Sequence, residues 1–395
     1  MNEITQHCSF CGKEKSVVKK LIVSDSVAIC NDCVDLCLSL LKDPAPSDTT
    51  DTDDQKMDPM VLKSYLDQYI IGQDRAKIML SVAIVNHYKR ISCNDPDVEI
   101  GKANILMLGP TGSGKTLLAK SVAKYLDVPF AIADATSVTE AGYVGDDVES
   151  LISRLYANSG NDVAKTQRGI IFVDEIDKIS RKSESASITR DVSGEGVQQA
   201  LLKIVEGTVC RIPAGGGRKH PSNEMIEIDT TNILFIAGGA FVGLDTIINK
   251  RVNVSTIGFN GSLQNQHDIK LDLVSPDDLV KFGLIPEFVG RFPGVVVLQE
   301  LEKQDLKRIL TEVKNNYITQ YQWLFTQDNI KLTFDSTAID AMVDRAIQSG
   351  TGARALQSEI ERALMPHMFY LKQYQSRGIE QVTINADNIT NPVAI

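Results

Sequence analysis

NILMLGPTGSGKT, residues 104–116, decides the fold of this chain. Residues 104–108 form a short apolar run, which predicts a buried β-strand. Residues 109–116 match the eight-residue phosphate-binding loop, and the apolar residues of 117–126 recur at helical spacing. The loop therefore stands between a strand and a helix, where the free N–H groups at a helix N-terminus face a bound phosphate. This order predicts an α/β P-loop domain.

The residue types in this loop are suited to binding phosphates and magnesium. Its glycines let backbone N–H groups turn toward phosphates, Lys115 is expected to reach the outer phosphates, and the Thr116 hydroxyl is expected to ligate magnesium. YIIGQ, residues 69–73, lies about forty residues upstream and is either an apolar slot for the base or only the turn that enters a helix. The residues expected to hold ATP are Ile71, Pro110, Thr111, Gly112, Ser113, Gly114, Lys115, Thr116 and Leu117.

A second apolar run, residues 170–173, ends in Asp174 and Glu175. A strand that ends in two acids is usually a solvated strand end, but a P-loop in the same chain changes that interpretation. We expect Asp174 to hold magnesium together with Thr116, and Glu175 to orient or deprotonate the attacking water. Nucleotide transfer would not need Glu175, so the sequence predicts ATP hydrolysis.

Two cysteine pairs near the start of the chain predict a zinc site. They are separated by eighteen residues and consist of Cys8, Cys11, Cys30 and Cys33. This spacing is typical of four-cysteine zinc sites, and so small a module needs a metal to fold. A redox dithiol is the alternative interpretation, and Cys37 and His7 are the alternative ligands.

The 395 residues are too many for one small core, so we expect several domains. Short apolar runs at 130–134 and 233–237 join those at 104–108 and 170–173, and helical patterns lie between them. This alternation predicts an α/β fold with a parallel sheet flanked by helices. The expected domains are a zinc-binding domain at 1–42, a flexible acidic linker at 43–56, a large ATPase domain at 57–298 and a small, mostly helical domain at 299–395. In the last we expect helices at 303–324, 336–348 and 353–374 and a final strand at 381–384.

Composition limits the classes of function. The net charge of -10 disfavours nucleic acid as the main partner, because phosphate neutralisation needs a basic surface. No apolar run approaches the length of a membrane span and the first residues lack a signal-peptide profile, so we expect a cytoplasmic protein. No arrangement of Ser, His and Asp or of Cys and His indicates a protease. Any peptide cleavage would have to come from a partner.

Ten motifs, in order, resemble the ClpX family of AAA+ unfoldases, the ATPase subunits of the ClpXP protease. The resemblance runs from residue 8 to about residue 371. Besides the cysteine pairs and the P-loop, the motifs are YIIGQ at 69–73, GYVG at 142–145, FVDEIDKISRK at 172–182, TRDVSGEGVQQALLK at 189–203, GGRKHP at 216–221, IGF at 257–259, LIPEFVGR at 284–291 and GAR at 352–354.

The resemblance implies a homohexameric ring with each nucleotide between neighbouring subunits. Arg291 then corresponds to the arginine finger that reaches the neighbour's nucleotide, and Arg354 to the sensor-2 arginine of the small domain. A guanidinium group suits both because it stays charged and binds phosphate oxygens with a planar fork. Gly238 and Gly239 stand where related ATPases place a polar sensor side chain, so no catalytic side chain is assigned there.

The resemblance also assigns the path of the substrate. Tyr143 and Val144 correspond to the axial pore loop that grips the polypeptide, and Arg218, Lys219 and His220 correspond to a basic loop at the pore entrance. Ile257, Gly258 and Phe259 correspond to the tripeptide that docks on the ClpP peptidase. The implied substrates are tagged or unfolded proteins, and the zinc module is implied to dimerise and to receive adaptors.

Two rival functions remain open at this point. A nucleic-acid motor would share the ATPase residues, but it should carry basic tracks and stacking aromatics, whereas this chain is acidic and has one Trp. A module that uses nucleotide as a switch would bind ATP without turnover.

Overall fold

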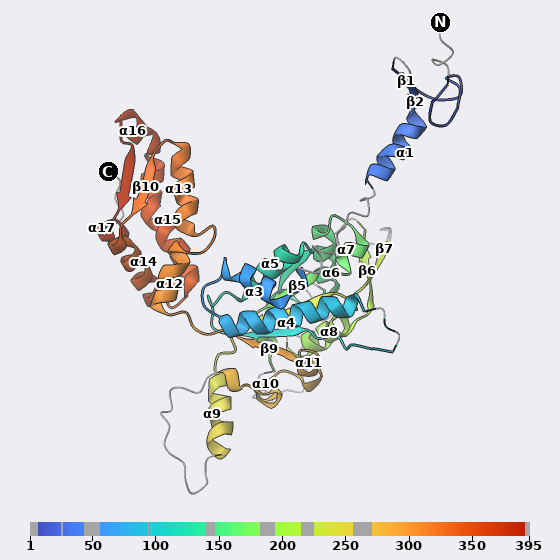
Figure 1. Cartoon of the computed structure of the whole chain (residues 1–395). Coiled ribbons are helices and arrows are strands. Elements are labelled where there is room, and N and C mark those ends of the chain that lie inside the picture. The colour runs from blue at the N-terminus through green and yellow to red at the C-terminus, as the bar shows by residue number, and fades with distance from the viewer. Residues whose placement is uncertain are drawn as a thin grey trace. The chain divides into compact units, whose positions relative to one another are not determined.

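The chain forms two compact units, Met1–Lys56 and Met57–Ile395 (Figure 1). The computed structural model describes residues 7–24, 27–42, 56–93, 95, 97–139, 147–181, 194–214, 225–255 and 271–391. The division of the second unit at residue 298 stays a prediction. None of the helices in these ranges is long and apolar enough to cross a membrane.

The first unit is small and has little apolar material. Strands β1 (Leu21–Val23) and β2 (Ala28–Cys30) pair antiparallel, and α1 (Asn31–Lys42) follows directly. The buried cluster consists of three cysteines with Val18, Leu21 and Ile29 packed against them. So few apolar side chains cannot offset the entropy of ordering the chain, and another source of stability is required.

The second unit is built on a five-stranded parallel sheet. Its strand order is β4 (Phe130–Asp134), β5 (Ile170–Asp174), β8 (Leu234–Gly239), β3 (Ile105–Leu108) and β9 (Gly294–Val297). Strands β3 and β8 are buried at every residue, as expected for a parallel sheet covered on both faces. The predicted α/β fold is therefore confirmed, with β9 as a strand that was not predicted.

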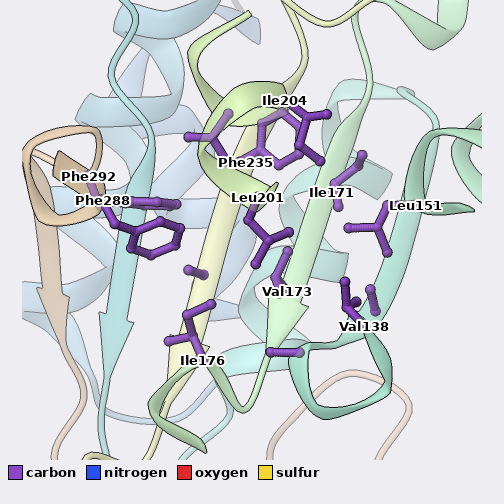
Figure 2. Close-up of a cluster of buried hydrophobic side chains, with 14 of the residues drawn as sticks. Val138, Leu151, Ile171, Val173, Ile176, Leu201, Ile204, Phe235, Phe288 and Phe292 are labelled. Carbon is purple, nitrogen blue, oxygen red and sulfur yellow. The ribbon is translucent and has the colours of Figure 1, made fainter. Parts of the chain in front are cut away.

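Alternate residues of the central strands supply two separate cores, because successive side chains point to opposite faces of a sheet. Ile105 and Met107 pack in one buried cluster, and Leu106 and Leu108 pack in the other. The first cluster is covered by α3 (Pro59–Asp67), α4 (Asp74–Ile91) and α5 (Lys115–Leu126). On the second face, Figure 2 shows Leu201 and Ile204 of α8 (Glu195–Glu206) beside Ile171, Val173 and Phe235.

Shorter elements complete the part around the sheet. They are η2 (Ala135–Ser137), α6 (Glu149–Asn158), α7 (Val163–Thr166), η3 (Ile176–Ile179), the antiparallel pair β6 (Val209–Pro213) and β7 (Met225–Asp229), α9 (Leu244–Ser255), η4 (Leu271–Leu273), α10 (Pro276–Phe282) and α11 (Pro286–Gly290).

The C-terminal part has its own core and its own small parallel sheet. Its elements are α12 (Lys303–Thr311), α13 (Tyr317–Gln327), β10 (Lys331–Phe334), α14 (Ser336–Gln348), α15 (Ala353–Phe369), α16 (Leu371–Ser376), β11 (Gln381–Ile384) and α17 (Ala386–Thr390). Strands β10 and β11 pair in parallel, with Lys331 opposite Gln381. The final strand was predicted and β10 was not.

Two predicted helices are each divided in the structure. The prediction of one helix over 303–324 was wrong, because α12 ends at Thr311 and α13 begins at Tyr317. Asn315 has a left-handed φ of 60°, and the Asn316 side chain accepts a hydrogen bond from the Thr319 N–H as the N-cap of the second helix. An asparagine pair at this place favours a cap over a continuous helix.

The prediction of one helix over 353–374 was also wrong. α15 ends at Phe369, and α16 begins at Leu371. Tyr370 between them has φ -102° and ψ 12°, outside the helical range. The apolar periodicity continues through the break because both helices pack on the same core, so periodicity alone could not reveal it.

Candidate nucleotide and metal sites

A cavity of about 770 Å³ lies in the second unit, at the carboxyl ends of β5 and β8 and beside the loop that follows β3. This is the edge at which parallel α/β sheets bind ligands. The cavity is lined by residues 111–117 of the phosphate-binding loop, by Asp174 and Glu175, and by Ile71. The opposite wall comes from the C-terminal part and includes Ile309, Val313 and Arg354.

The phosphate-binding loop follows β3 and leads into the N-terminus of α5, as predicted. Gly112 and Gly114 have φ of 80° and 99°, a region that favours glycine. A Cβ on Gly112 would collide with the Thr351 carbonyl, so the loop approaches the C-terminal part too closely for any side chain. Gly112 therefore serves both the turn and the contact between the two walls, and Gly114 serves the turn.

Lys115 is buried within the phosphate-binding loop. Its Nζ donates to the carbonyl oxygens of Gly109 at 2.6 Å and Pro110 at 3.0 Å. Burial lowers the pKa of the Lys115 ammonium, and the nearby carboxylates of Asp174 and Asp177 partly oppose that shift. An ammonium that is already desolvated and points inward suits a polyphosphate, whose charge would favour the protonated form.

Asp174 and Thr116 meet although they are 58 residues apart in sequence. The Thr116 hydroxyl donates to the Asp174 carboxylate at 3.1 Å, and the Glu175 N–H donates to the other carboxylate oxygen at 2.9 Å. Glu175 has a left-handed φ of 56°, which is uncommon for a residue other than glycine and is often found at functional sites. A hydroxyl and a carboxylate in contact are a donor set that fits Mg²⁺.

Asp177 is a cavity residue that the sequence analysis missed. Its buried carboxylate accepts hydrogen bonds from the N–H groups of Ala240 at 3.3 Å and Phe241 at 3.2 Å. A Cβ on Gly239 would lie 2.7 Å from an Asp177 oxygen, so only glycine leaves room for this carboxylate. The polar group at the end of β8 therefore comes from the neighbouring strand's loop, and the Gly-Gly pair was the available signal.

The segment YIIGQ forms part of the cavity wall. Ile70 and Ile71 are buried and line the cavity, while Gly72 has φ 63° and leads into α4. The segment is therefore both an apolar wall and a helix-entry turn. The buried Lys77 ammonium, another residue not predicted, donates to the Ile70 carbonyl at 2.9 Å and pairs with Asp67 at 2.5 Å.

The two predicted arginines lie in different places. Arg354 stands at the start of α15 and lines the cavity. Arg291 is not among the residues that line it. Its side chain is half exposed and donates from Nε to the Glu206 carboxylate at 2.8 Å.

The predicted substrate and docking residues cannot be placed. Tyr143 and Val144, the basic residues Arg218, Lys219 and His220, and the tripeptide Ile257, Gly258 and Phe259 lie outside the described residues.

The four cysteine sulfurs of the first unit converge to within 4.8 Å of one another. Cys8 Sγ lies 3.8 Å from Cys33 Sγ, and Cys11 Sγ lies 3.6 Å from Cys30 Sγ. Tetrahedral zinc with bonds of about 2.3 Å requires sulfurs about 3.8 Å apart, so the cluster fits Zn²⁺. His7 pairs instead with Glu14 at 3.6 Å.

Backbone N–H groups prepare the sulfur of Cys8 for a metal, whereas the neighbouring cysteine sulfurs raise the pKa of the Cys33 thiol. The Cys30 N–H donates to Cys8 Sγ at 3.3 Å. Burial raises the pKa of the Cys8 thiol, but the N–H groups of Cys11, Cys30 and Phe10 outweigh burial and lower it to about 6. A thiolate is the form that binds zinc.

Comparisons with known proteins match each part of the chain. The model of the AAA domain (Cdc48 subfamily) matches residues 101–295, that of the ClpX C4-type zinc finger matches residues 6–43, and that of the C-terminal, D2-small domain of ClpB protein matches residues 301–377. These matches confirm the predicted AAA+ ATPase, with ATP and Mg²⁺ as its cofactors, and the predicted zinc module.

One relative matches nearly the whole chain. The ATP-dependent Clp protease ATP-binding subunit ClpX of Treponema denticola is 53% identical over 392 residues, which cover 97% of this chain and 94% of the relative. The matched residues span both units. The chain therefore belongs to the ClpX family of AAA+ ATPases.

Proposed function

We propose that this chain forms a homohexameric ring that recognises tagged or unfolded proteins. The ring unfolds them through an axial pore and delivers them to the ClpP peptidase. One observation carries the proposal. The ATP cavity is walled on one side by the sheet and on the other by the C-terminal part, with Arg354 among its lining residues. Hydrolysis in such a cavity changes the ligand that lies between the two walls. The walls then move relative to each other, and the energy of the hydrolysed bond is converted into motion.

The side chains of the cavity divide the chemistry of hydrolysis. Lys115 and the N-terminus of α5 would hold the outer phosphates, and Thr116 and Asp174 would hold Mg²⁺. Glu175 would orient and deprotonate water, and Arg354 would contact phosphate from the opposite wall. Bound ATP supplies the phosphoanhydride bond whose hydrolysis releases the energy.

Arg291 acts, in this proposal, on the nucleotide of a neighbouring subunit. Its absence from the lining of its own cavity and its half-exposed guanidinium support that role. The pairing with Glu206 would keep the side chain extended until a neighbour's phosphate replaces the carboxylate.

The remaining roles follow from membership of the family. We assign Tyr143 and Val144 to gripping the substrate, the basic residues 218–220 to the pore entrance, and residues 257–259 to docking on ClpP. The zinc module would dimerise and receive adaptors and substrates. The domain boundaries at 42, 56 and 298 and a cytoplasmic location belong to the same proposal.

Degradation of a tagged fluorescent protein tests the proposal. Glu175→Gln should bind ATP but hydrolyse it at least about 100-fold more slowly, because a general base contributes a factor of this size. Tyr143→Ala should keep ATP hydrolysis and lose unfolding. Phe259→Ala, the control, should keep unfolding and lose degradation by added ClpP. Unaltered unfolding by both Glu175→Gln and Tyr143→Ala would refute the proposal.

A further inference from the structure

Gln73 makes a contact that the roles assigned above do not explain. Its side-chain Nε2 donates to the Gln299 carbonyl at 2.8 Å, and the Gln299 N–H donates to Gln73 Oε1 at 2.9 Å. The Gln73 amide thus pairs with the Gln299 backbone as a second peptide group would in a β-ladder. The two residues are 226 positions apart.

Gln73 makes this contact from an uncommon backbone conformation. Gln73 has φ 57° and ψ 30°, in the left-handed region that glutamine seldom adopts. It occupies the N-cap of α4, yet its side chain makes no capping hydrogen bond. The side chain is therefore used for Gln299 at the expense of its own helix.

The two ends of this pair lie close in sequence to residues that line the ATP cavity, Ile71 on one side and Leu301 on the other, although neither Gln73 nor Gln299 lines it. Gln73 directly follows the wall segment that contains Ile70 and Ile71. Gln299 stands just after Leu298, whose N–H donates to the Leu108 carbonyl at 2.7 Å, directly beyond the last paired residues of β3 and β9. Residues 299–302 then lead to α12, which carries the opposite wall.

Neighbouring contacts hold the same two segments together. The Lys314 N–H donates to the Gln68 carbonyl at 2.7 Å. A Cβ on Gly72 would lie 3.7 Å from the Asp305 carboxylate. The pair at Gln73 is made by a side-chain amide, so it can be removed without altering the main chain.

We propose that Gln73 is a positioning residue that couples occupation of the apolar wall at Ile70 and Ile71 to the connection at Gln299. This inference rests on ATP binding in the cavity described above. A base seated against Ile71 fixes the segment that ends at Gln73, and the amide pair passes that restraint to Gln299. The start of the C-terminal part is then held in register with the nucleotide.

Two substitutions separate this role from a structural one. Gln73→Ala removes both hydrogen bonds, and we expect it to weaken ATP binding about tenfold. Gln73→Glu keeps the acceptor for the Gln299 N–H but places a carboxylate against the Gln299 carbonyl. Gln299→Ala is the matched control, because it leaves the backbone pair intact and removes only the side chain, whose Nε2 donates to Asp272 at 3.3 Å.

The Glu variant makes the test dependent on pH. A protonated carboxyl group can donate to the Gln299 carbonyl as the amide does, so acid should restore the pair. As the pH falls from 8 to 5.5, the ATP affinity of Gln73→Glu relative to that of the parent chain should rise. The relative ATP affinity of Gln73→Ala should not. A side chain needed only for packing would show no such difference.

Hydrogen exchange of peptides that contain the Gln299 amide gives a readout independent of activity. In the parent chain and in Gln299→Ala, ATP should slow exchange of this amide. In Gln73→Ala, exchange should be about tenfold faster without ATP, and saturating ATP should not slow it. In Lys115→Ala, which loses ATP binding, the amide should keep its protection without ATP.

Failure of this inference is distinct from failure of the nucleotide site. Equal slowing of the Gln299 amide by ATP in Gln73→Ala and in the parent chain would overturn the coupling. So would an equal loss of ATP affinity in Gln299→Ala. If the parent chain binds no ATP, the nucleotide site itself is refuted.

Discussion

The zinc module and the nucleotide-binding unit are stabilised in opposite ways. The buried cluster of the module consists of Cys8, Cys30 and Cys33 with three partly buried neighbours. The second unit buries apolar side chains in three separate clusters, two of them on the faces of the sheet. The first region therefore depends on coordination bonds, and the second on removing apolar surface from water.

The two sites also differ in how far apart in the sequence their residues lie. The zinc ligands lie within 25 positions of one another: Cys8 and Cys11 precede the hairpin, Cys30 ends β2 and Cys33 lies in α1. The cavity draws its walls from residues as distant as Ile71 and Arg354. A local site can form once its ligand arrives, whereas the cavity exists only after the whole second unit has folded.

Removal of zinc should have the largest effect and should break one region alone. Structural zinc contributes roughly 10 to 16 kcal/mol in small modules, so a strong chelator or Cys30→Ser should unfold residues 7–42 completely. The thermal midpoint of the second unit should stay unchanged. NMR spectra of the full chain, with Cys37→Ser as a control that keeps the metal, check this. A module that stays folded without zinc would contradict the comparison.

Acid should produce the second largest effect, through a buried histidine of the second unit. His87 Nε2 lies 3.2 Å from the Asn232 carbonyl, and its Nδ1 has no hydrogen-bond partner among the residues that the structure describes. Burial and, to a smaller extent, the positive charges of Arg90 and Lys102 lower the pKa of His87 to about 3, although the hydrogen bond with Asn232 opposes the shift. The unfolded chain, with a His pKa near 6.5, therefore binds more protons below that pH, and folding is opposed.

The sign and size of the effect follow from this linkage. The contribution of His87 to stability is complete above about pH 6.5 and falls by about 1.4 kcal/mol for each pH unit below it, until about pH 3. Denaturant unfolding of the second unit from pH 7.5 to pH 5 should show this slope. His87→Gln should flatten the slope, because the titrating imidazole is gone. The glutamine amide can still donate to the Asn232 carbonyl, so that contact is kept. Equal slopes in both chains would assign the acid sensitivity to other groups.

The surface pair of Arg291 and Glu206 should have the smallest effect on stability. Arg291 is 54% exposed and Glu206 is 39% exposed, so we expect either alanine substitution to cost less than about 1 kcal/mol. ATP hydrolysis should distinguish the two. Arg291→Ala should reduce it by about 1,000-fold or more if the guanidinium acts on a neighbour's phosphate, and Glu206→Ala should not. Similar hydrolysis by both variants would remove that role from Arg291.

Much of the chemistry could be predicted because it is written in contiguous residues. The P-loop, the acidic end of β5 and the cysteine pairs each combine residue type with short spacing, and the fold and cofactors that they predicted are confirmed. The prediction of helices failed where two local signals disagreed, a helix cap and a continuing apolar periodicity. The Asn315 and Asn316 cap divides a stretch whose apolar periodicity suggested one helix.

The sequence by itself determined a strand, loop and helix for phosphate and a knuckle spacing for zinc, because backbone conformation and ligand geometry act over a few residues. Only the tertiary structure decided that Asp177 fills the space left by Gly239, that Arg354 reaches the cavity and that Gln73 pairs with Gln299. The physical reason is distance along the chain. Contacts between residues separated by tens or hundreds of positions depend on how the sheet and helices pack, and no local pattern encodes that packing.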